Sequence, residues 1–141
     1  MFNIYLKKLY KNCPEFEGSN WLIRIPLIMV FIQQGFDKLP FDQSTADAYG
    51  LPTLIWFSVI LFELIAGFGL LFGGMLRSLG FFVLLGDILT RFSGIIMVSI
   101  ITGVIVVSKP ESFFEIILYD HFHVILYCGG LFFALRGNRV K

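Results

Sequence analysis

Glu63 is the only ionisable residue in the 22-residue run from Leu51 to Phe72. A run of about 18 or more apolar residues is typical of a membrane-spanning helix. A charged side chain near the centre of a bilayer costs at least about 2.5 kcal/mol, so it normally faces a partner or a cavity. The expected partner is Arg91, which lies in the next apolar run.

Four charged residues are predicted to form one network between the helices. Glu63 and Arg91 each lie 12 residues from the start of antiparallel segments, so a rise of about 1.5 Å per residue places both near the membrane midplane. Asp87 precedes Arg91 by one turn, and Arg24 is the nearest cation at the depth of Asp87. This network either orients the helices or lines a pathway for a quinone, protons or a small molecule.

The sequence Asp120-His121-Phe122-His123 is a second candidate for chemistry. On a helix Asp120 and His123 share a face, whereas His121 and His123 point about 200° apart and do not chelate one metal. Histidine exchanges protons near neutral pH, and a neighbouring carboxylate orients its ring. Glu63, Asp120 and His123 are therefore the predicted catalytic groups. The alternative is a histidine that only joins helices by hydrogen bonds.

Polar residues at matching depth are predicted to bind a ligand, with quinone as the expected cofactor: Gln34, Lys38, His121 and His123. We predict no metal site, because no Cys and His residues have zinc spacing and the paired Glu and Glu-x-x-His ligands of di-iron bundles are missing from the sequence. The chain also carries no flavin or dinucleotide motif, so an enzyme that acts alone is the least supported alternative.

The composition indicates that lipid surrounds the elements that carry these residues. Hydrophobic residues make up 57% of the chain, and charged residues make up 15%, against about 25% in a soluble domain. Four segments are predicted to span a membrane: 21–36, 51–72, 79–107 and 113–135. We therefore predict an all-α, antiparallel four-helix membrane bundle over residues 20–136, with a juxtamembrane segment, 1–19, and a tail, 137–141.

Capping chemistry predicts where these helices begin and end. The predicted starts are Asn20, Pro52 and the capping box Ser112 to Glu115, and the predicted stops are Gly73-Gly74 and Gly137-Asn138. The third segment is longer than a bilayer requires, so it tilts, projects beyond the membrane or breaks near Gly86. Gly69 and Gly73 have the Gly-x-x-x-Gly spacing that lets helices approach closely.

Basic residues predict the orientation. Seven of them fall on one side of the proposed spans: Lys7, Lys8, Lys11, Arg77, Arg136, Arg139 and Lys141. Only Lys38 and Lys109 fall on the other side, so the positive-inside rule places both termini in the cytoplasm. The net charge of +1 gives no reason to expect nucleic-acid binding.

Three blocks of the sequence resemble the DoxX-like family of small four-helix membrane proteins. In the first helix of that family an Arg is followed 11 residues later by a Gly and three later by a Lys, as in Arg24, Gly35 and Lys38 here. Glu63 to Gly67 is similar to the family's Glu-Leu-x-x-Gly segment, and Leu89-Thr90-Arg91 to its Leu-Thr-Arg. Gln34 stands where many members have His.

The resemblance implies a bacterial inner-membrane subunit of a quinone-linked oxidoreductase complex, which binds quinone or relays protons through its buried charges. Its partners would be the lipid bilayer and other protein subunits or a second copy of the chain. The first alternative is a membrane anchor without catalytic function that recruits a larger partner. A small-molecule transporter is the second alternative, because buried charges also line transport pathways.

Overall fold

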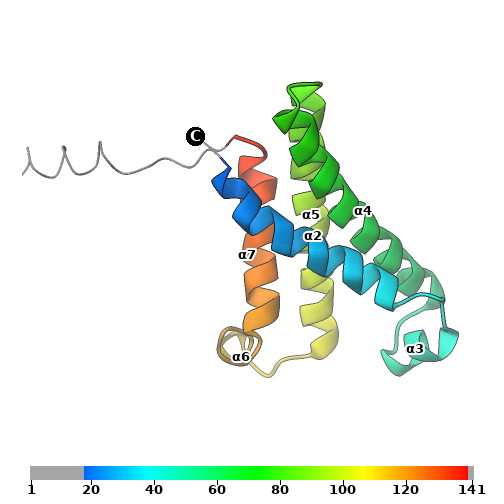
Figure 1. The fold of residues 1–141 in the computed structure, drawn as a ribbon. Coiled ribbons are helices and arrows are strands. Elements are labelled where there is room, and N and C mark those ends of the chain that lie inside the picture. Colours follow the sequence, from blue (N-terminus) through cyan, green and yellow to red (C-terminus); the bar gives the residue numbers. More distant parts are fainter. Residues whose placement is uncertain (1–17, 140–141) are drawn as a thin grey trace, which may run out of the picture.

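The computed structural model describes residues 18–139, and within this range the fold is all-α, without strands (Figure 1). The helices are α2 (Ser19–Asp37), α3 (Gln43–Ala48), α4 (Thr53–Ser78), α5 (Val83–Ser108), α6 (Phe113–Tyr119) and α7 (His121–Arg136). The all-α prediction is confirmed. Most of the predicted juxtamembrane segment lies outside the described residues, together with Lys7, Lys8, Lys11, Cys13 and Lys141.

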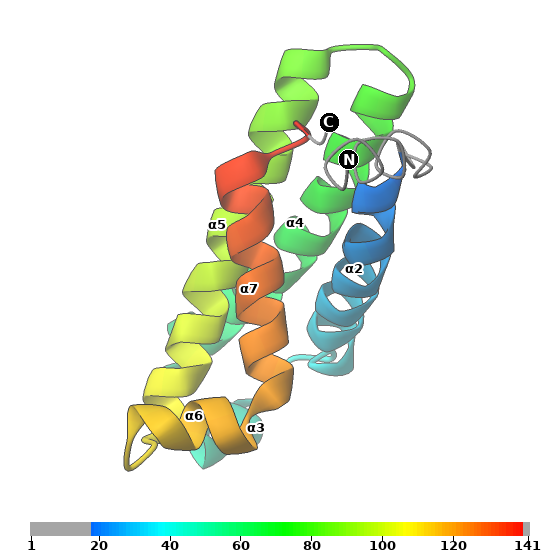
Figure 2. The ribbon, with the colours of Figure 1, turned by 90° about the vertical axis from the view of Figure 1, so that its left-hand side faces the viewer.

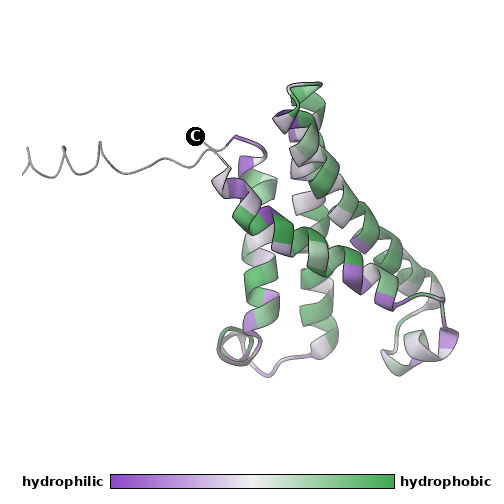
Figure 3. Cartoon of the chain, in the orientation of Figure 1, coloured by the Kyte–Doolittle hydropathy of each residue, from purple (hydrophilic) through white to green (hydrophobic). Residues whose placement is uncertain are grey.

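In the described part of the chain, α4 and α5 are the two helices long and apolar enough to cross a membrane. Each has 26 residues, which at about 1.5 Å per residue exceeds the hydrocarbon thickness of about 30 Å. Much of both helices is green in Figure 3, the colour of hydrophobic residues. Helix α7 is also apolar but has only 16 residues, and α2 has 19.

Successive long helices run in opposite directions (Figures 1 and 2). Helix α4 packs against α2 and α5, and α5 packs against α7, whereas α2 and α7 touch at few points. Buried side chains from all four helices form the core, among them Phe31, Leu70, Met97 and Phe133. The short helices α3 and α6 lie at the same end of the long helices, but apart from each other: α3 lies beside α4, and α6 lies beside α7.

Small residues set the close packing of α4 against α5. A Cβ atom added to Gly73 would lie 2.8 Å from the carbonyl oxygen of Gly86 and 3.0 Å from the amide of Thr90, and one added to Gly69 would collide with Ser93. The predicted close approach is therefore confirmed. The predicted helix stop at Gly73-Gly74 is wrong, because both glycines lie inside α4 where neighbouring side chains and backbone leave no room for a Cβ.

The predicted fourth span, 113–135, is divided into two helices at Asp120. Helix α6 begins at the predicted capping box, where the Glu115 amide donates to Ser112 Oγ at 3.3 Å. The Glu115 carboxylate accepts from the amide of Glu111, and not from that of Ser112 as in a standard capping box. Helix α6 ends at Tyr119 because the Asp120 side chain caps α7, accepting from the amide of His123 at 3.4 Å. Helix α6 lies across the ends of α5 and α7 (Figure 2).

Other boundaries differ less from the prediction. Helix α2 begins at Ser19 without a side-chain cap, so Asn20 lies in the first turn and is not its N-cap. Helix α5 begins at Val83 and continues through Gly86 without a break. Gly137, with φ of 60°, ends α7 at the predicted position.

Candidate functional site

Glu63 pairs with Lys38 and not, as predicted, with Arg91. The Lys38 ammonium lies 2.8 and 2.9 Å from the two carboxylate oxygens of Glu63, and it also donates to the backbone and side-chain oxygens of Gln34 at 3.0 and 3.1 Å. Lys38 directly follows α2, and its long side chain folds back over the last turn of that helix to reach α4. Glu63 is only 5% exposed, so this charge pair is largely shielded from solvent.

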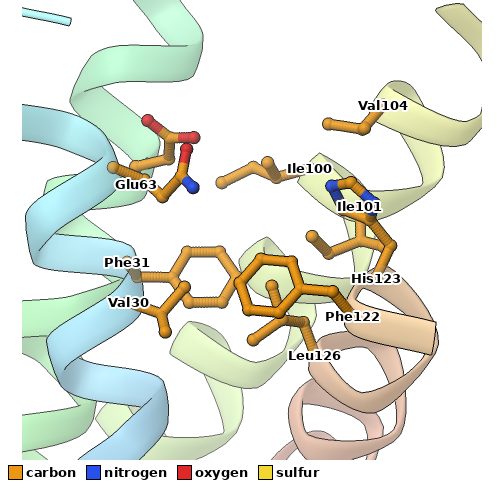
Figure 4. A pocket seen from close by; sticks show the side chains of 10 residues that line it. Val30, Phe31, Glu63, Ile100, Ile101, Val104, Phe122, His123 and Leu126 are labelled. Atoms are coloured by element: carbon orange, nitrogen blue, oxygen red, sulfur yellow. The ribbon is translucent and has the colours of Figure 1, made fainter. Parts of the chain in front are cut away.

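A small cavity lies beside this pair, where α2 and α7 diverge. Its volume is about 30 Å³, which is enough to hold a water molecule, since a cavity needs about 10–15 Å³ for one. Figure 4 shows Glu63 on one side of the cavity, His123 on the other and aromatic rings between them. The walls come from α2, α4, α5 and α7: Val30, Phe31, Gln34, Glu63, Ile100, Ile101, Val104, Phe122, His123 and Leu126. The polar groups therefore face one another across mostly apolar walls.

His123 is held by Asp120. Its Nδ1 atom lies 2.6 Å from the carboxylate of Asp120, the same carboxylate that caps α7. Both side chains are about one-third exposed. Asp120 thus fixes the direction of the ring, as expected from their three-residue spacing. His121 is exposed and lines neither this cavity nor a second cavity described below. The structure therefore does not place it with the other predicted ligand-binding residues.

A second, more polar cavity lies on the other side of the Lys38–Glu63 pair, between the end of α2, helix α3 and the start of α4. Its volume is about 300 Å³, and its walls are Gln34, Asp37, Lys38, Pro40, Asp42, Thr45, Tyr49 and Trp56. Gln34 lines both cavities. Hydrogen bonds from the side chain and amide of Ser44 hold the pKa of the Asp42 carboxyl below its ordinary value, so Asp42 is ionised at neutral pH.

The remaining members of the predicted network lie at the opposite end of the molecule. Arg24 is fully buried: it donates to the carbonyl oxygen of Leu70 at 2.6 Å, to Thr90 Oγ1 at 3.2 Å and to Asn138 Oδ1 at 2.6 Å. The ring of Phe133 lies 4.5 Å from its guanidinium carbon. Among residues 18–139, no carboxylate forms an ion pair with Arg24.

Asp87 and Arg91 bind the carboxyl end of α7. They pair at 2.9 Å, and Asp87 also accepts from the amide of Asn138 at 2.7 Å. Arg91 donates to three consecutive carbonyl groups at the end of α7, at 2.7 to 3.2 Å. These are carbonyls that a helix leaves without intrahelical partners. The single predicted network is therefore wrong: Glu63 belongs to a separate cluster.

We call the second cluster the carboxyl-terminal clasp: Arg24, Asp87, Thr90, Arg91 and Asn138. Thr90 and Asn138 are the members that the predicted network did not include, since Thr90 entered only through the Leu-Thr-Arg resemblance and Gly137-Asn138 indicated only the end of a helix. Asn138 makes the larger difference. It is fully buried, and its side chain bonds Arg24, Thr90 and the carbonyl of Gly73. The segment predicted as a tail from residue 137 thus begins inside the packed structure.

The clasp and the cluster around Glu63 differ in whether their polar groups border a cavity. The polar side-chain atoms of the clasp form hydrogen bonds with one another and with backbone groups. The exception is Arg24 Nε, which makes no hydrogen bond. Glu63 and His123 border a cavity, which makes their cluster the candidate functional site. Comparison with protein-family models, curated proteins and solved structures finds no match for this chain.

Proposed function

We propose that this chain is a multi-pass protein of the bacterial inner membrane, a DoxX-like subunit of a quinone-linked oxidoreductase complex. In this proposal α2, α4, α5 and α7 form an antiparallel four-helix membrane bundle with both termini in the cytoplasm. The length of α4 and α5 supports it, as does the large exposed apolar surface of these helices, which includes Leu54, Phe57 and Phe72. The seven basic residues predicted on one side support the orientation.

The observation that carries the functional proposal is the meeting of Glu63 and His123 at one cavity with apolar walls. Reduction of a quinone consumes protons as well as electrons. A carboxyl group and an imidazole held by Asp120 can bind and release protons beside such a ring. The electrons would come from a partner subunit of the complex.

Binding of the ring requires the cavity to widen. At about 30 Å³ the cavity is smaller than a quinone ring, but it lies between α2 and α7, which touch at few points. Phe122 forms part of the wall and is 49% exposed, so its ring can turn outward without loss of core packing. A lipid-soluble molecule would therefore enter sideways, between these two helices.

Purification in mild detergent, followed by assay of quinone-dependent electron transfer, tests the proposal. We expect bound quinone in the wild-type protein. We expect Glu63→Gln and His123→Ala to lower turnover by about 10²- to 10⁴-fold, the range for loss of a general acid or base. Glu111→Gln, an exposed carboxylate away from both cavities, is the matched control. Unchanged turnover in both site variants would reject the redox function.

The clasp favours a second candidate, a membrane anchor without catalytic function. Its charged residues join α2, α4, α5 and α7 at the end that the proposal places in the cytoplasm. A larger partner would bind there. A partner complex that survives purification with Glu63→Gln and His123→Ala, together with unchanged turnover, would support the anchor.

A further inference from the structure

The Lys38–Glu63 pair separates two cavities of different character. On one side lies the apolar-walled cavity that also contains His123, and on the other lies the polar cavity beneath α3. Gln34 lines both cavities and accepts a hydrogen bond from Lys38. Lys38, Gln34 and Glu63 therefore form a polar connection between the two spaces.

The polar cavity can hold water. Its volume of about 300 Å³ is far above the ~10–15 Å³ that a cavity needs to hold a water molecule. Three of the polar residues that line it, Asp37, Asp42 and Thr45, are exposed, so the cavity is open to the surroundings. It lies beside α3, at the end of the long helices that the proposed orientation places outside the cytoplasm.

Lys38 has the properties of a gate. Its flexible side chain is only 17% exposed while its ammonium bonds both oxygens of Glu63. Because its side chain is flexible, Lys38 can turn away from Glu63 toward Asp37 and Asp42, which line the polar cavity with it. That movement would open the Glu63 carboxylate to the water of the polar cavity. Protonation of Glu63 then removes the negative charge that draws the ammonium back, and Lys38 closes the entry again once Glu63 has given its proton to the inner cavity.

We propose that the polar cavity is a water-filled entry through which Glu63 exchanges protons with the aqueous phase outside the cytoplasm, with Lys38 as the gate. A hydronium ion gives its proton to the Glu63 carboxylate, and Lys38 keeps its charge. The neutral carboxyl then donates the same proton to an acceptor in the inner cavity and becomes a carboxylate again, so charge and protons balance.

The charged and titratable groups around Glu63 come from three directions. Lys38 and Asp37 lie at the end of α2, Asp42 lies at the start of α3, and His123 with Asp120 lies across the inner cavity on α7. Helix α5 contributes apolar cavity walls. This inference rests on the proposed function for the orientation and for the final proton acceptor, but the exchange at Glu63 does not require a quinone.

Trp56 provides a reporter for the test, because the Lys38 ammonium lies 5.9 Å from its ring centroid. Trp21→Phe leaves Trp56 as the only tryptophan of the chain. In lipid nanodiscs of this protein, a rapid pH jump should produce a Trp56 fluorescence phase that disappears in Glu63→Gln. Thr45→Phe fills the polar cavity and should slow this phase several-fold, and the smaller Thr45→Leu should slow it less.

Ala48→Phe is the matched control, since it adds the same ring to an exposed position of α3 that does not line the cavity. Helix content by circular dichroism checks that each variant folds. Equal rates in the Thr45 and Ala48 variants, or a wild-type phase that does not depend on Glu63, would overturn the entry.

The same samples separate the two proposals. Quinone that copurifies with a protein whose rate is unaffected by Thr45→Phe would overturn the entry alone. A rate that falls in Thr45→Phe, in a protein whose turnover is unchanged by Glu63→Gln and His123→Ala, would support the entry and reject the quinone function.

Discussion

Among the described residues, the buried Arg24 and the part-buried Lys38 are stabilised in different ways. Lys38 has a carboxylate partner, Glu63, whereas Arg24 is surrounded by a carbonyl, a hydroxyl, an amide oxygen and the ring of Phe133. A buried charge is costly unless hydrogen bonds satisfy it, and removal of one partner leaves that cost uncompensated. Asn138 is the most informative residue to change, because its side chain bonds three separate elements.

We predict that Asn138→Ala lowers the free energy of unfolding by about 1.5–3 kcal/mol, the range for hydrogen bonds to charged groups. The substitution removes the Asn138 oxygen that accepts from Arg24 at 2.6 Å. Denaturant unfolding in detergent micelles, followed by circular dichroism, measures the change. Arg139→Ala, an exposed neighbour, is the control, and equal stability of the two variants would show that the clasp does not stabilise the fold.

The sequence predicted which charged residues lie within apolar helices but not how they pair. Counting residues from predicted helix starts placed Glu63 level with Arg91. Helix α5 begins four residues later than predicted, and the flexible Lys38 reaches back from the end of α2. The Asp87–Arg91 and Asp120–His123 contacts were predictable because they depend only on spacing within one chain segment. The inward turn of Asn138 depends on how α7 packs, which no local pattern encodes.

At the level of helices, α4 and α5 approach so closely that backbone atoms meet. Gly73 and Gly86 lie opposite each other, and a Cβ added to either would come within 2.8 Å of the other's carbonyl oxygen. In lipid, van der Waals packing of this kind is a main source of helix association.

Gly73→Ala should therefore lower the free energy of unfolding by about 1–3 kcal/mol, the usual cost of an overpacked contact, because backbone atoms cannot move aside as a side chain can. Gly103→Ala in α5 is the matched control: its added Cβ meets nothing within 4 Å, so the higher helix propensity of alanine should leave stability unchanged or raise it by up to about 1 kcal/mol. Thermal unfolding of both variants in the same detergent measures the difference. A Gly73→Ala variant as stable as Gly103→Ala would contradict the close contact.

The hydrophobic runs predicted four long helices, which the described part of the chain has, but they placed the ends of these helices less accurately. At both places where a predicted boundary was wrong, the residues have a second role that the sequence also allows. The two glycines of Gly73-Gly74 serve packing instead of termination, and Asp120 interrupts an apolar run by capping a new helix. A cap and an apolar run are both local signals, and only the packing of α6 across the neighbouring helices decides between them.

For the whole molecule, the proposed function requires all four long helices to cross the membrane. Helices α4 and α5 are each long and apolar enough to cross it, whereas α2, with 19 residues, is less apolar and α7 has only 16. Helix α2 packs against α4, and α7 packs against α5. With four crossings, residues 48 and 139 lie on opposite sides. With α4 and α5 as the only crossings, they lie on the same side, because the chain returns to the starting face before α6.

We predict that a membrane-impermeant maleimide labels Ala48→Cys in intact cells but labels Arg139→Cys only after the membrane is opened. Both positions are exposed and outside the long helices, and Cys13 and Cys128 would first be replaced by Ser. Labelling of both positions from the same side would reject the four-crossing orientation. Composition predicted the all-α class at this scale, but the separation between α2 and α7 follows from side-chain packing that composition does not describe.

The position of Asn138 also bears on how the protein is made. Asn138 is synthesised 114 residues after Arg24, the cation that it holds. In the proposed membrane fold, helix α2 would therefore be delivered to the insertion machinery with a guanidinium whose final acceptor does not yet exist. Until the ribosome has added residue 138, that charge must be sheltered by water, lipid headgroups or a chaperone, so nascent chains halted before this point should be preferred substrates for membrane proteases.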